Sequence, residues 1–399
     1  MGRDGNGLEA QRFGRQHTQL MNRPLRLALI CDLLEEEWPS MDLVAEMLLS
    51  HAEKDERVTT TRVRPSLARR LSRLPLGARR SSFGLGADRL VNRMWDVPRA
   101  ARLSRRQNDV FHVCDHSYAH AVHALPAERV GVFCHDLDAF RSVLEPGREP
   151  RPLWYRTMSR SLLRGLTKAR VVFYSTDSVR DGIRKYDLVD DRKLVKANYG
   201  VSPEFTRAPF ERANLDHLPI RTLEGKPFLL HVGSCIPRKR IDVLLDVFAE
   251  AKRANPDLRL VQVGGTWTEE QRAQIERLHL TESLVQFRGI ERTELAEIYR
   301  RATLVLMPSE AEGFGLPVIE ALSCGAIVLA SDIPPLREVG GAGVPMLPVG
   351  DIGLWSAKVT EILRDPACAP EDAVRLAQAA RFSWTGHAKI IVDTYLGLS

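Results

Sequence analysis

The sequence predicts an α/β protein built from two parallel sheets, each covered by helices. From Leu25 onward, short apolar runs alternate with helical patterns, which is typical of βαβ units. This alternation fades in a polar, proline-containing stretch around Glu204–Lys226 and begins again at Phe228. The length of 399 residues, with 44% hydrophobic and 27% charged residues, is enough for two such domains with ample cores.

In the first series, a helical pattern covers Ser40–Lys54. Ser40 is placed to cap this helix, and Leu43, Met47 and Leu48 share one face. The five apolar runs that we expect as strands are Leu25–Cys31, Arg57–Val63, Val110–Val113, Arg129–Cys134 and Arg170–Ser175.

The second series repeats the pattern and then ends in helices. Its expected strands are Phe228–Val232, Leu258–Gly264, Leu284–Arg288, Thr303–Met307 and Ala326–Ala330. The expected helices are Asp242–Arg253, Thr268–Leu278, Thr293–Arg301, Asp351–Leu363, Pro370–Arg381 and His387–Leu396. Two Rossmann-like halves that face each other across a cleft are the expected architecture, with ligands at the carboxyl ends of the strands.

The domain boundaries follow from the same pattern. Residues 1–23 are polar and are expected to form a disordered tail, and residues 207–226 are expected to be a linker. The first domain is then 24–206 and the second is 227–381.

The stretch Glu312-Gly-Phe-Gly-Leu-Pro-Val-Ile-Glu320 places two carboxylates eight residues apart, around a turn and a helix start. Gly313 and Gly315 allow close backbone approach, Pro317 suits a first helical turn, and Gly325 is a natural stop. Amides at a helix start attract phosphate, and carboxylates accept hydrogen bonds from hydroxyls. The motif therefore predicts a site for a ligand with the layout of a nucleotide-sugar.

A basic segment, Arg238-Lys239-Arg240, follows the first strand of the second half and opens a helix. It is placed at a carboxyl-edge loop, where Arg supplies a bidentate fork and Lys a mobile charge for a diphosphate. A solvated basic turn is the alternative for this segment taken alone.

Together these segments resemble the C-terminal half of the family-four retaining glycosyltransferases, which have the GT-B fold and an E-x7-E signature. The resemblance covers roughly Phe228–Pro348, and the terminal Phe382-Ser-Trp384 with its helix (382–399) resembles the segment that crosses back onto the first domain. The residues that carry it are Gly233, Pro237, Lys239, Val263-Gly264-Gly265, Gly289, Pro308-Ser309, Glu312 to Ala321, Gly325 and Glu338-Val339.

The resemblance implies a role for each donor-site residue. Lys239 binds the donor diphosphate, Glu312 the sugar hydroxyls and Glu320 the ribose, while Gly289 and Ile290 lie near the base. Ser234 stands where the family often has Arg, and Arg238 is the candidate to supply that charge. The implied donor-binding set is Gly233, Ser234, Arg238, Lys239, Gly264, Gly289, Ile290, Glu312, Gly313, Phe314, Gly315, Leu316 and Glu320.

In the first half, His135 ends a strand and resembles the family's His-Asp segment, which implies that it points toward the transferred sugar. With Lys239 and Glu312 it makes up the expected catalytic set. Asp115, His116 and Asp136 also follow strands and are candidates to bind the acceptor.

The first βα loop differs from the family's usual sequence, and an Arg-rich region lies outside the stretch that resembles the family. The first βα loop, Cys31–Asp42, carries bulky acidic side chains in place of a Gly-Gly pair, so its acids are candidates to read acceptor hydroxyls. The region Arg62–Arg106 is rich in Arg, and Leu67, Leu71 and Leu74 share helical spacing. Such a segment is either an ordinary domain surface or a peripheral contact with an anionic membrane.

The rest of the composition narrows the class of protein. The net charge is +6, and the six cysteines are scattered without a CxxC pair, which favours buried thiols in a reducing compartment. No apolar run is long enough to span a bilayer. We therefore expect a cytoplasmic protein, peripheral at most at the inner face of the membrane, with no metal, no cofactor and no nucleic-acid partner.

The expected function is transfer of a hexosyl-type sugar from a nucleotide-sugar to a sugar or lipid-linked acceptor, with retention and without metal. Cell-surface glycan or glycolipid synthesis is the expected setting. The alternatives are a non-catalytic nucleotide-sugar-binding subunit, or another GT-B enzyme such as a phosphorylase or epimerase. A dinucleotide oxidoreductase is disfavoured because neither half opens with G-x-G-x-x-G.

Overall fold

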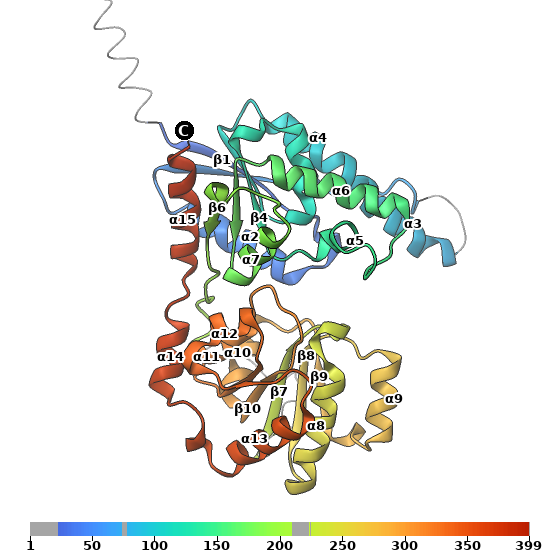
Figure 1. Cartoon of the computed structure of the whole chain (residues 1–399), viewed down its shortest axis with the longest axis vertical. Coiled ribbons are helices and arrows are strands. Elements are labelled where there is room, and N and C mark those ends of the chain that lie inside the picture. The colour runs from blue at the N-terminus through green and yellow to red at the C-terminus, as the bar shows by residue number, and fades with distance from the viewer. Residues whose placement is uncertain (1–22, 74–77, 210–222, 224, 399) are drawn as a thin grey trace, which may run out of the picture. The chain divides into compact units, whose positions relative to one another are not determined.

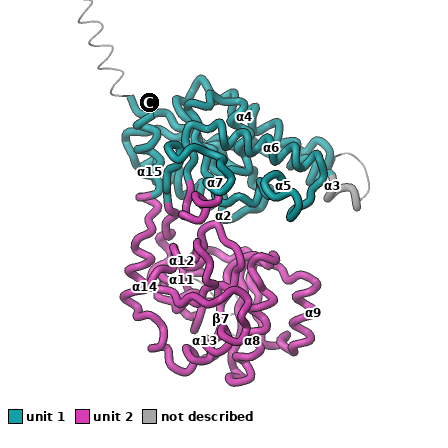
Figure 2. The backbone as a smooth tube through the Cα atoms, viewed as in Figure 1, with its two compact units in different colours: residues 1–173, 183–197, 387–399 teal, residues 174–182, 198–386 magenta. Residues whose placement is uncertain are grey.

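The computed structural model describes residues 23–73, 78–209, 223 and 225–398 (Figure 1). The expected tail, apart from residue 23, and most of the expected linker lie outside these residues. The chain divides into two compact units (Figure 2). Unit 1 consists of residues 1–173, 183–197 and 387–399, and unit 2 of residues 174–182 and 198–386.

The first sheet has six strands in the order β2-β1-β3-β4-β5-β6. The pairs β1–β2, β1–β3 and β3–β4 are parallel, and the central strands are buried along their length. The strands are β1 (Leu25–Ile30), β2 (Val58–Val63), β3 (Val110–Val113), β4 (Val130–Cys134), β5 (Val171–Tyr174) and β6 (Leu194–Lys196).

Helices and short turns connect these strands. The helices are α2 (Pro39–Ala52), α3 (Ala78–Val91), α4 (Val97–Ser104), α5 (Arg141–Leu144), α6 (Leu153–Lys168), α7 (Asp177–Lys185) and the C-terminal α15 (Trp384–Leu396). The shorter turns are η1 (Leu34–Glu36), the π-helical η2 (Asn92–Asp96), η3 (His116–Ala124), η4 (Ala127–Arg129), η5 (Asp138–Phe140) and η6 (Asp191–Lys193).

The C-terminal helix α15 is built into unit 1. Tyr395 is fully buried, and its hydroxyl donates to the carbonyl of Phe111 (3.0 Å) and lies 3.0 Å from Nδ1 of His112. Gly131 of β4 lies under this hydroxyl, where a Cβ would overlap it. The predicted return of the C-terminal helix to the first domain is confirmed.

The second sheet also has six strands, in the order β12-β11-β10-β7-β8-β9, and its neighbouring strands are parallel. Its strands are β7 (Phe228–Gly233), β8 (Arg259–Gly264), β9 (Leu284–Phe287), β10 (Leu304–Met307), β11 (Val328–Ser331) and β12 (Met346–Leu347). Its helices are α8 (Ile241–Ala254), α9 (Glu269–Arg277), α10 (Arg292–Arg301), α11 (Leu316–Ser323), α12 (Pro334–Gly340), α13 (Ile352–Arg364) and α14 (Asp372–Ala379). The turns are η8 (Pro237–Lys239), η9 (Thr281–Ser283), η10 (Gly341–Gly343) and η11 (Pro366–Cys368).

Three sequence predictions are wrong in detail. Helix α2 begins at Pro39 with Trp38 before it, so Ser40 is inside the helix and does not cap it. The segment up to Arg73 is not helical, because the buried Asp88 carboxylate accepts the N–H groups of Arg70, Leu71 and Ser72. Leu74 lies outside the described residues. Each sheet also has a short sixth strand, β6 or β12, that was not predicted.

Both sheets share one topological feature that places the sites. In the first sheet, β1 lies between β2 and β3, and in the second, β7 lies between β8 and β10. The chain therefore winds to one side of its first strand and later returns on the other side. Ligands of doubly wound sheets bind at the carboxyl ends of the strands at such a switch point. We therefore expect the ligand sites at the carboxyl ends of β1 and β3 in unit 1 and of β7 and β10 in unit 2.

Among the described residues, no helix is both long and apolar enough to cross a bilayer. Five of the cysteines are buried as expected, whereas Cys368 is exposed.

Candidate active site

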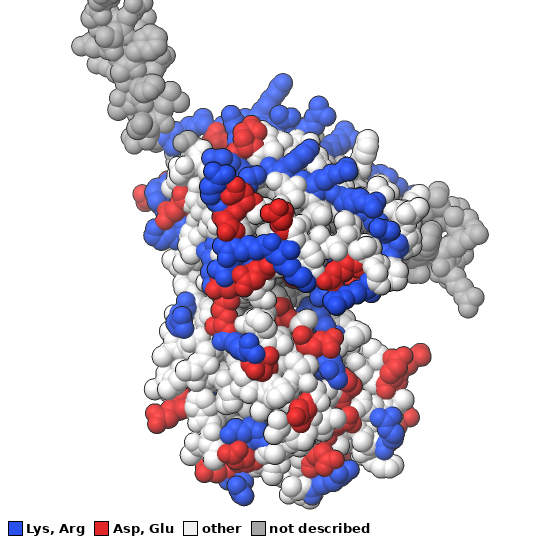
Figure 3. All heavy atoms as spheres, viewed as in Figure 1, with Lys and Arg blue, Asp and Glu red and all other residues white. Residues whose placement is uncertain are grey.

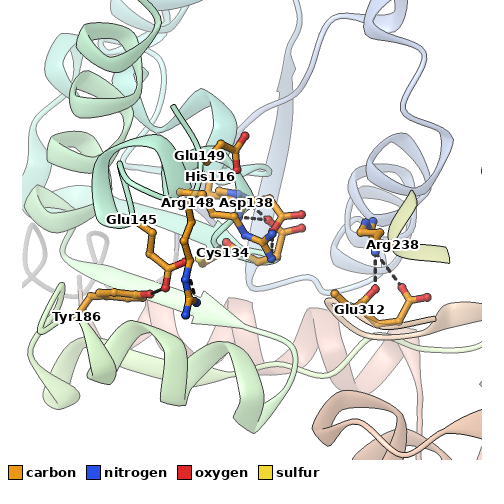
Figure 4. A network of polar contacts seen from close by, with 12 residues as sticks. His116, Cys134, Asp138, Glu145, Arg148, Glu149, Tyr186, Arg238 and Glu312 are labelled. Carbon is orange, nitrogen blue, oxygen red and sulfur yellow. Dashed lines mark hydrogen bonds and ion pairs between the residues drawn. The ribbon is translucent and has the colours of Figure 1, made fainter. Parts of the chain in front are cut away.

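An ion pair joins the two loops at the switch point of unit 2. Lys239 ends η8 after β7, and Glu312 lies in the loop between β10 and α11. Nζ of Lys239 is 2.5 Å from Oε1 of Glu312, and the two side chains are 9% and 6% exposed. Arg238 points at the same carboxylate, with Nη1 3.3 Å from Oε2, and also donates to the carbonyl of Ala311 at 2.9 Å (Figure 4). The structure therefore brings together three of the four charged residues predicted for the donor site, and Glu320 is the fourth.

The two cations, Lys239 and Arg238, change the pKa of the Glu312 carboxyl group. Burial alone would raise the pKa of Glu312, but the Lys239 ammonium and the Arg238 guanidinium bring that pKa below its ordinary value. His231 lies nearby on β7, and burial, together with Lys239, lowers its pKa to about 3, so the imidazole is neutral. A buried charged pair is costly to assemble, which makes it a sign of function more than of stability.

At the start of α11, Gly315 precedes the helix at φ +99° and has no side chain that could cap its first amides. The side chain of Phe314 is buried against Tyr199 and Phe382, at centroid distances of 4.7 and 5.6 Å. Thr176 holds the turn by donating to the carbonyl of Gly313 (2.9 Å). Phe314 is therefore an anchor of the turn, and only the backbone of this segment is placed to meet a ligand.

Close backbone contact explains one of the predicted glycines, Gly264. Gly264 at the end of β8 has φ +109°, and a Cβ there would come within 3.2 Å of the carbonyl oxygen of Gly233. Gln262 donates to that same carbonyl at 2.7 Å and accepts from Gln286 at 2.7 Å. This ladder of amides fixes the ends of β7 and β8 beneath the loop that carries Lys239.

Glu320 lies one turn into α11 and is buried. The hydroxyl of Tyr299 on α10 donates to its Oε2 at 3.2 Å. Burial raises the pKa of Glu320 to about 7, against the effects of Tyr299 and Arg292, and Glu204 adds to the rise. Near neutral pH this carboxyl group is therefore divided between its protonated and ionised forms.

This pKa predicts a pH-dependent stability. Between about pH 4.5 and pH 7 the folded chain keeps a proton on Glu320 that the unfolded chain has lost, so the free energy of unfolding falls as the pH rises. Glu320→Gln removes this loss of stability, because the Gln side chain does not ionise. The variant should equal the wild type near pH 4.5 and be more stable by on the order of 3 kcal/mol above pH 7. Denaturant unfolding of both proteins across this range measures the difference, and a difference that does not change with pH would contradict the assignment.

Three predicted donor residues are not joined to the ion pair by any described contact. Ser234 is exposed in the loop after β7. Gly289, at φ +63°, and Ile290 follow β9, the edge strand of the sheet, two strands away from β7. The roles of Gly289 and Ile290 near the base, and of Ser234 in the loop for the diphosphate, stay predictions.

The predicted residues of unit 1 gather at the carboxyl ends of β3 and β4. Nδ1 of His116 is 3.3 Å from Asp115, and Nε2 is 3.4 Å from Asp136. The backbone N–H of His135 donates to Nδ1 of His116 (3.3 Å). The ring of His135 stacks on Phe133, and its Nε2 lies 2.8 Å from the carbonyl of Cys114. All four predicted residues of this half therefore form one group, in which Asp136 is half-buried and the other three are buried.

The pKa values of the two histidines in this group are shifted in opposite directions. Burial lowers the pKa of His135 despite the nearby Asp115, so this ring is neutral. Burial also opposes a charge on His116, but Asp115 and Asp136 raise its pKa above the ordinary value. Asp115 additionally caps η3 by accepting the N–H of Ser117 at 2.6 Å. Across the described residues, no group of three or more His, Cys, Asp or Glu is arranged to hold a metal ion.

Four residues of these sites were not predicted from the sequence. Tyr299 and Thr176 position Glu320 and the turn at Gly313. His231 and Gln262 lie under the Lys239 loop. In the sequence, these residues could have been recognised only as polar side chains in or beside an apolar run, as for His231 in Leu230-His-Val232.

Comparison with known proteins places this arrangement in a family. The model of the family described as "Glycosyl transferases group 1" matches residues 216–382. The O-antigen chain mannosyltransferase B of Escherichia coli is 30% identical over 277 residues, which are 67% of this chain and 70% of that protein. The chain belongs to the glycosyl transferases group 1 family.

Other similarities agree with this family and with its fold. The serotype-specific mannosyltransferase WbdA of Escherichia coli is 26% identical over 293 residues, which are 71% of this chain but only 36% of WbdA. A crystal structure of Anabaena HepE in complex with UDP and glucose has a TM-score of 0.68 at 14% identity, covering 93% of this chain and 99% of that one. The predicted α/β GT-B fold with two Rossmann-like domains is confirmed.

Proposed function

We propose that this protein transfers a sugar from a nucleoside diphosphate sugar to an acceptor hydroxyl, with retention at the anomeric carbon and without a metal or other cofactor. One observation carries the proposal: the buried Lys239–Glu312 pair at the switch point of unit 2. The pair holds an ammonium group, which suits a diphosphate, within hydrogen-bond distance of a carboxylate, which suits hydroxyls. Family membership makes a nucleotide-sugar the expected ligand of this pair.

The residues of unit 2 supply electrostatic stabilisation. As the glycosidic bond breaks, negative charge grows on the leaving diphosphate, and Lys239, Arg238 and the start of α11 are the groups that would bind it. Preorganised charges of this kind often contribute more to the rate acceleration than any other effect in an active site. Glu312 would hold the sugar hydroxyls, and Glu320 the ribose. No side chain is assigned as a nucleophile, so the donor phosphate itself is proposed to take the acceptor proton on the same face.

His135 is the proposed contribution of unit 1 to the reaction. Its ring is fixed by the carbonyl of Cys114 and by Phe133, which suits a neutral group that orients a sugar. Asp115, His116 and Asp136 beside it are proposed to bind the acceptor.

We propose cell-surface glycan or glycolipid synthesis as the setting. The two curated relatives above are named as mannosyltransferases, so mannose is the first sugar to test.

The test is release of nucleoside diphosphate from a panel of nucleotide-sugars, with and without sugar acceptors. We expect one donor to be consumed and its sugar to appear on an acceptor with unchanged anomeric configuration by NMR. Binding of a donor without any turnover would favour the alternative of a non-catalytic subunit. Turnover that requires inorganic phosphate would favour a phosphorylase.

A peripheral membrane contact of unit 1 is the second part of the proposal. Within the Arg-rich region 62–106, we propose η2 and α4 as the surface that makes this contact. Trp95 and Leu103 are 69% and 70% exposed there. On the face drawn in Figure 3, Lys and Arg gather over the part of unit 1 where α4 and α6 lie. Exposed arginines around the two apolar side chains have no acidic partner within ion-pair distance among the described residues; they are Arg99, Arg102, Arg105 and Arg106.

This surface predicts binding to anionic lipid. Vesicles of phosphatidylglycerol and phosphatidylcholine should bind the protein, and Arg102→Glu with Arg106→Glu should lower the partition coefficient about tenfold or more, since each cation near such a surface contributes about 1 kcal/mol. Arg253→Glu, on an exposed and paired position of α8, is the matched control. Equal binding to neutral vesicles, or no loss in the double variant, would refute the contact.

A further inference from the structure

Two cysteine side chains are in contact at the carboxyl edge of the first sheet. Cys31 directly follows β1, and Cys114 directly follows β3. The strands pair in parallel with Ile30 opposite Val113, and the N–H of Cys114 continues the ladder by donating to the carbonyl of Ile30 at 3.0 Å. The two cysteines therefore lie opposite each other on one face of the sheet, and their Sγ atoms are 3.9 Å apart.

This placement permits a disulfide bond without rearrangement of the sheet. Neighbouring strands are about 4.7–4.9 Å apart, and disulfides join residues whose Cα atoms are about 4.4–6.8 Å apart. The two Sγ atoms must approach from 3.9 Å to the bonding distance of about 2.0 Å. Rotation of the two side chains, with a small approach of the strand ends, supplies this movement.

The two thiols differ in how readily they ionise. The neighbouring Cys114 thiol lowers the pKa of Cys31 below its ordinary value although burial opposes the fall, and the charges of Arg64 and Arg62 contribute to it. Cys31 and burial raise the pKa of Cys114 well above its ordinary value. Because the thiolate is the form that reacts with oxidants, Cys31 is the thiol that reacts first.

The depth of the pair selects the oxidant. Cys31 is 2% exposed and Cys114 is 4% exposed, so only a small reagent reaches them. Hydrogen peroxide is small enough, whereas a bulky disulfide is not. The exposed Cys368 is open to both kinds of reagent.

The backbone of Cys114 supports the proposed active site in unit 1. Its carbonyl oxygen lies 2.8 Å from Nε2 of His135 and fixes that ring. The next residue, Asp115, caps η3 by accepting the N–H of Ser117 at 2.6 Å. A shift of Cys114 toward β1 therefore moves both the carbonyl that holds His135 and the start of η3.

We propose that Cys31 and Cys114 form a redox switch, in which a peroxide converts them into a disulfide and the disulfide slows sugar transfer by displacing the carbonyl that orients His135. This regulation rests on the proposed function, in which His135 orients the transferred sugar. Where thiols are kept reduced, disulfides are usually transient and redox-sensing, so the dithiol is the resting and active form.

One molecule of hydrogen peroxide balances the oxidation. The Cys31 thiolate attacks one peroxide oxygen, the O–O bond breaks, and the departing hydroxide takes up the proton that the Cys31 thiol released, which gives water. The thiol of Cys114 then attacks the Cys31 sulfur, the S–S bond forms, the S–O bond breaks, and the hydroxyl group leaves with the Cys114 proton as a second water. The two sulfur atoms lose two electrons in total, and the peroxide gains both. Two molecules of a small thiol reverse the step by exchange and leave as their own disulfide.

Peroxide treatment of the whole protein tests the switch. Mass spectrometry of its tryptic peptides should show a link between the peptides that hold Cys31 and Cys114. The kcat/KM for sugar transfer should fall about tenfold or more, since misplacement of an orienting group by about 1 Å can cost about 100-fold. Dithiothreitol should restore the activity.

Two variants control this experiment. Cys31→Ser should keep the activity of the reduced wild type and lose the response to peroxide, because it cannot form the disulfide. If that variant folds poorly, Cys31→Ala gives the same comparison. Cys368→Ser, at an exposed cysteine, is the matched control and should respond to peroxide as the wild type does.

Three outcomes would overturn the inference while the proposed function stands. One is the absence of the link in the treated wild type, which would leave the two residues as small apolar side chains of the core. Another is full activity of the linked protein. The third is a response to peroxide that persists in Cys31→Ser.

If the reduced wild type transfers no sugar at all, the proposed function fails, and the ring of His135 still decides the inference. In NMR spectra of protein with ¹³C-labelled histidine, the signal that is missing from His135→Gln belongs to His135. It should shift when the wild type is oxidised, return with dithiothreitol and stay unchanged in Cys31→Ser. An unshifted signal in the linked wild type would contradict the proposed displacement.

Discussion

Lys239→Ala should reduce the kcat/KM for sugar transfer by about 100- to 1000-fold, the range seen when one preorganised group that stabilises developing negative charge is removed. The Nζ of Lys239 is 2.5 Å from Oε1 of Glu312, in the loop that leads to α11. Without it, the leaving diphosphate keeps only Arg238 and the helix amides. Steady-state kinetics with the donor identified by the panel measure the effect. Lys358→Ala, at a half-buried lysine paired with Glu361 on α13, is the matched control.

Loss of Lys239 also leaves the buried Glu312 carboxylate without its cation. The resulting loss of stability must be distinguished from a loss of catalysis. Removing one partner of a buried pair typically costs about 3–5 kcal/mol. The double variant Lys239→Met with Glu312→Gln leaves neither charge and should regain much of the lost stability. It should remain inactive. Recovery of activity together with stability would show that Lys239 serves the fold and not the reaction.

Glu320→Ala should weaken binding of the donor nucleotide by about 100-fold. The carboxylate is proposed to accept two ribose hydroxyls, and two such charged hydrogen bonds are together worth roughly 3 kcal/mol or more. Calorimetric titration with the nucleoside diphosphate measures the change. Tyr299→Phe removes the hydroxyl that donates to Glu320 Oε2 and should cause a smaller loss, about tenfold or less. Unchanged affinity in Glu320→Ala would remove this residue from the site.

The sheets could be predicted from the sequence because their strands are buried apolar runs. Predicted and observed strand ends differ by one or two residues, as for Leu25–Cys31 against Leu25–Ile30. The strands β6 and β12 were missed because they have three and two residues and are only half buried. The failed helix before Arg73 has a different cause, since the partner that captures its backbone, Asp88, lies 16 to 18 residues away in the chain.

The site could be predicted only in part, for a similar reason. Lys239 and Glu312 are 73 residues apart, and their contact follows from the order of β7 and β10 in the sheet, which no local pattern reveals. The glycines and the helix start of the Glu312 motif carry local signals, so they were found.

The central claim is that unit 2 recognises a diphosphate through Lys239 and a ribose through Glu320. Titration of UDP, UMP, GDP and GMP into the wild type and the Lys239→Ala and Glu320→Ala variants tests it most directly. One nucleoside diphosphate should bind the wild type at least about tenfold more tightly than its monophosphate. Lys239→Ala should abolish that preference, and Glu320→Ala should weaken both ligands alike. Equal affinity of the wild type for diphosphate and monophosphate, or an undiminished preference in Lys239→Ala, would contradict the account.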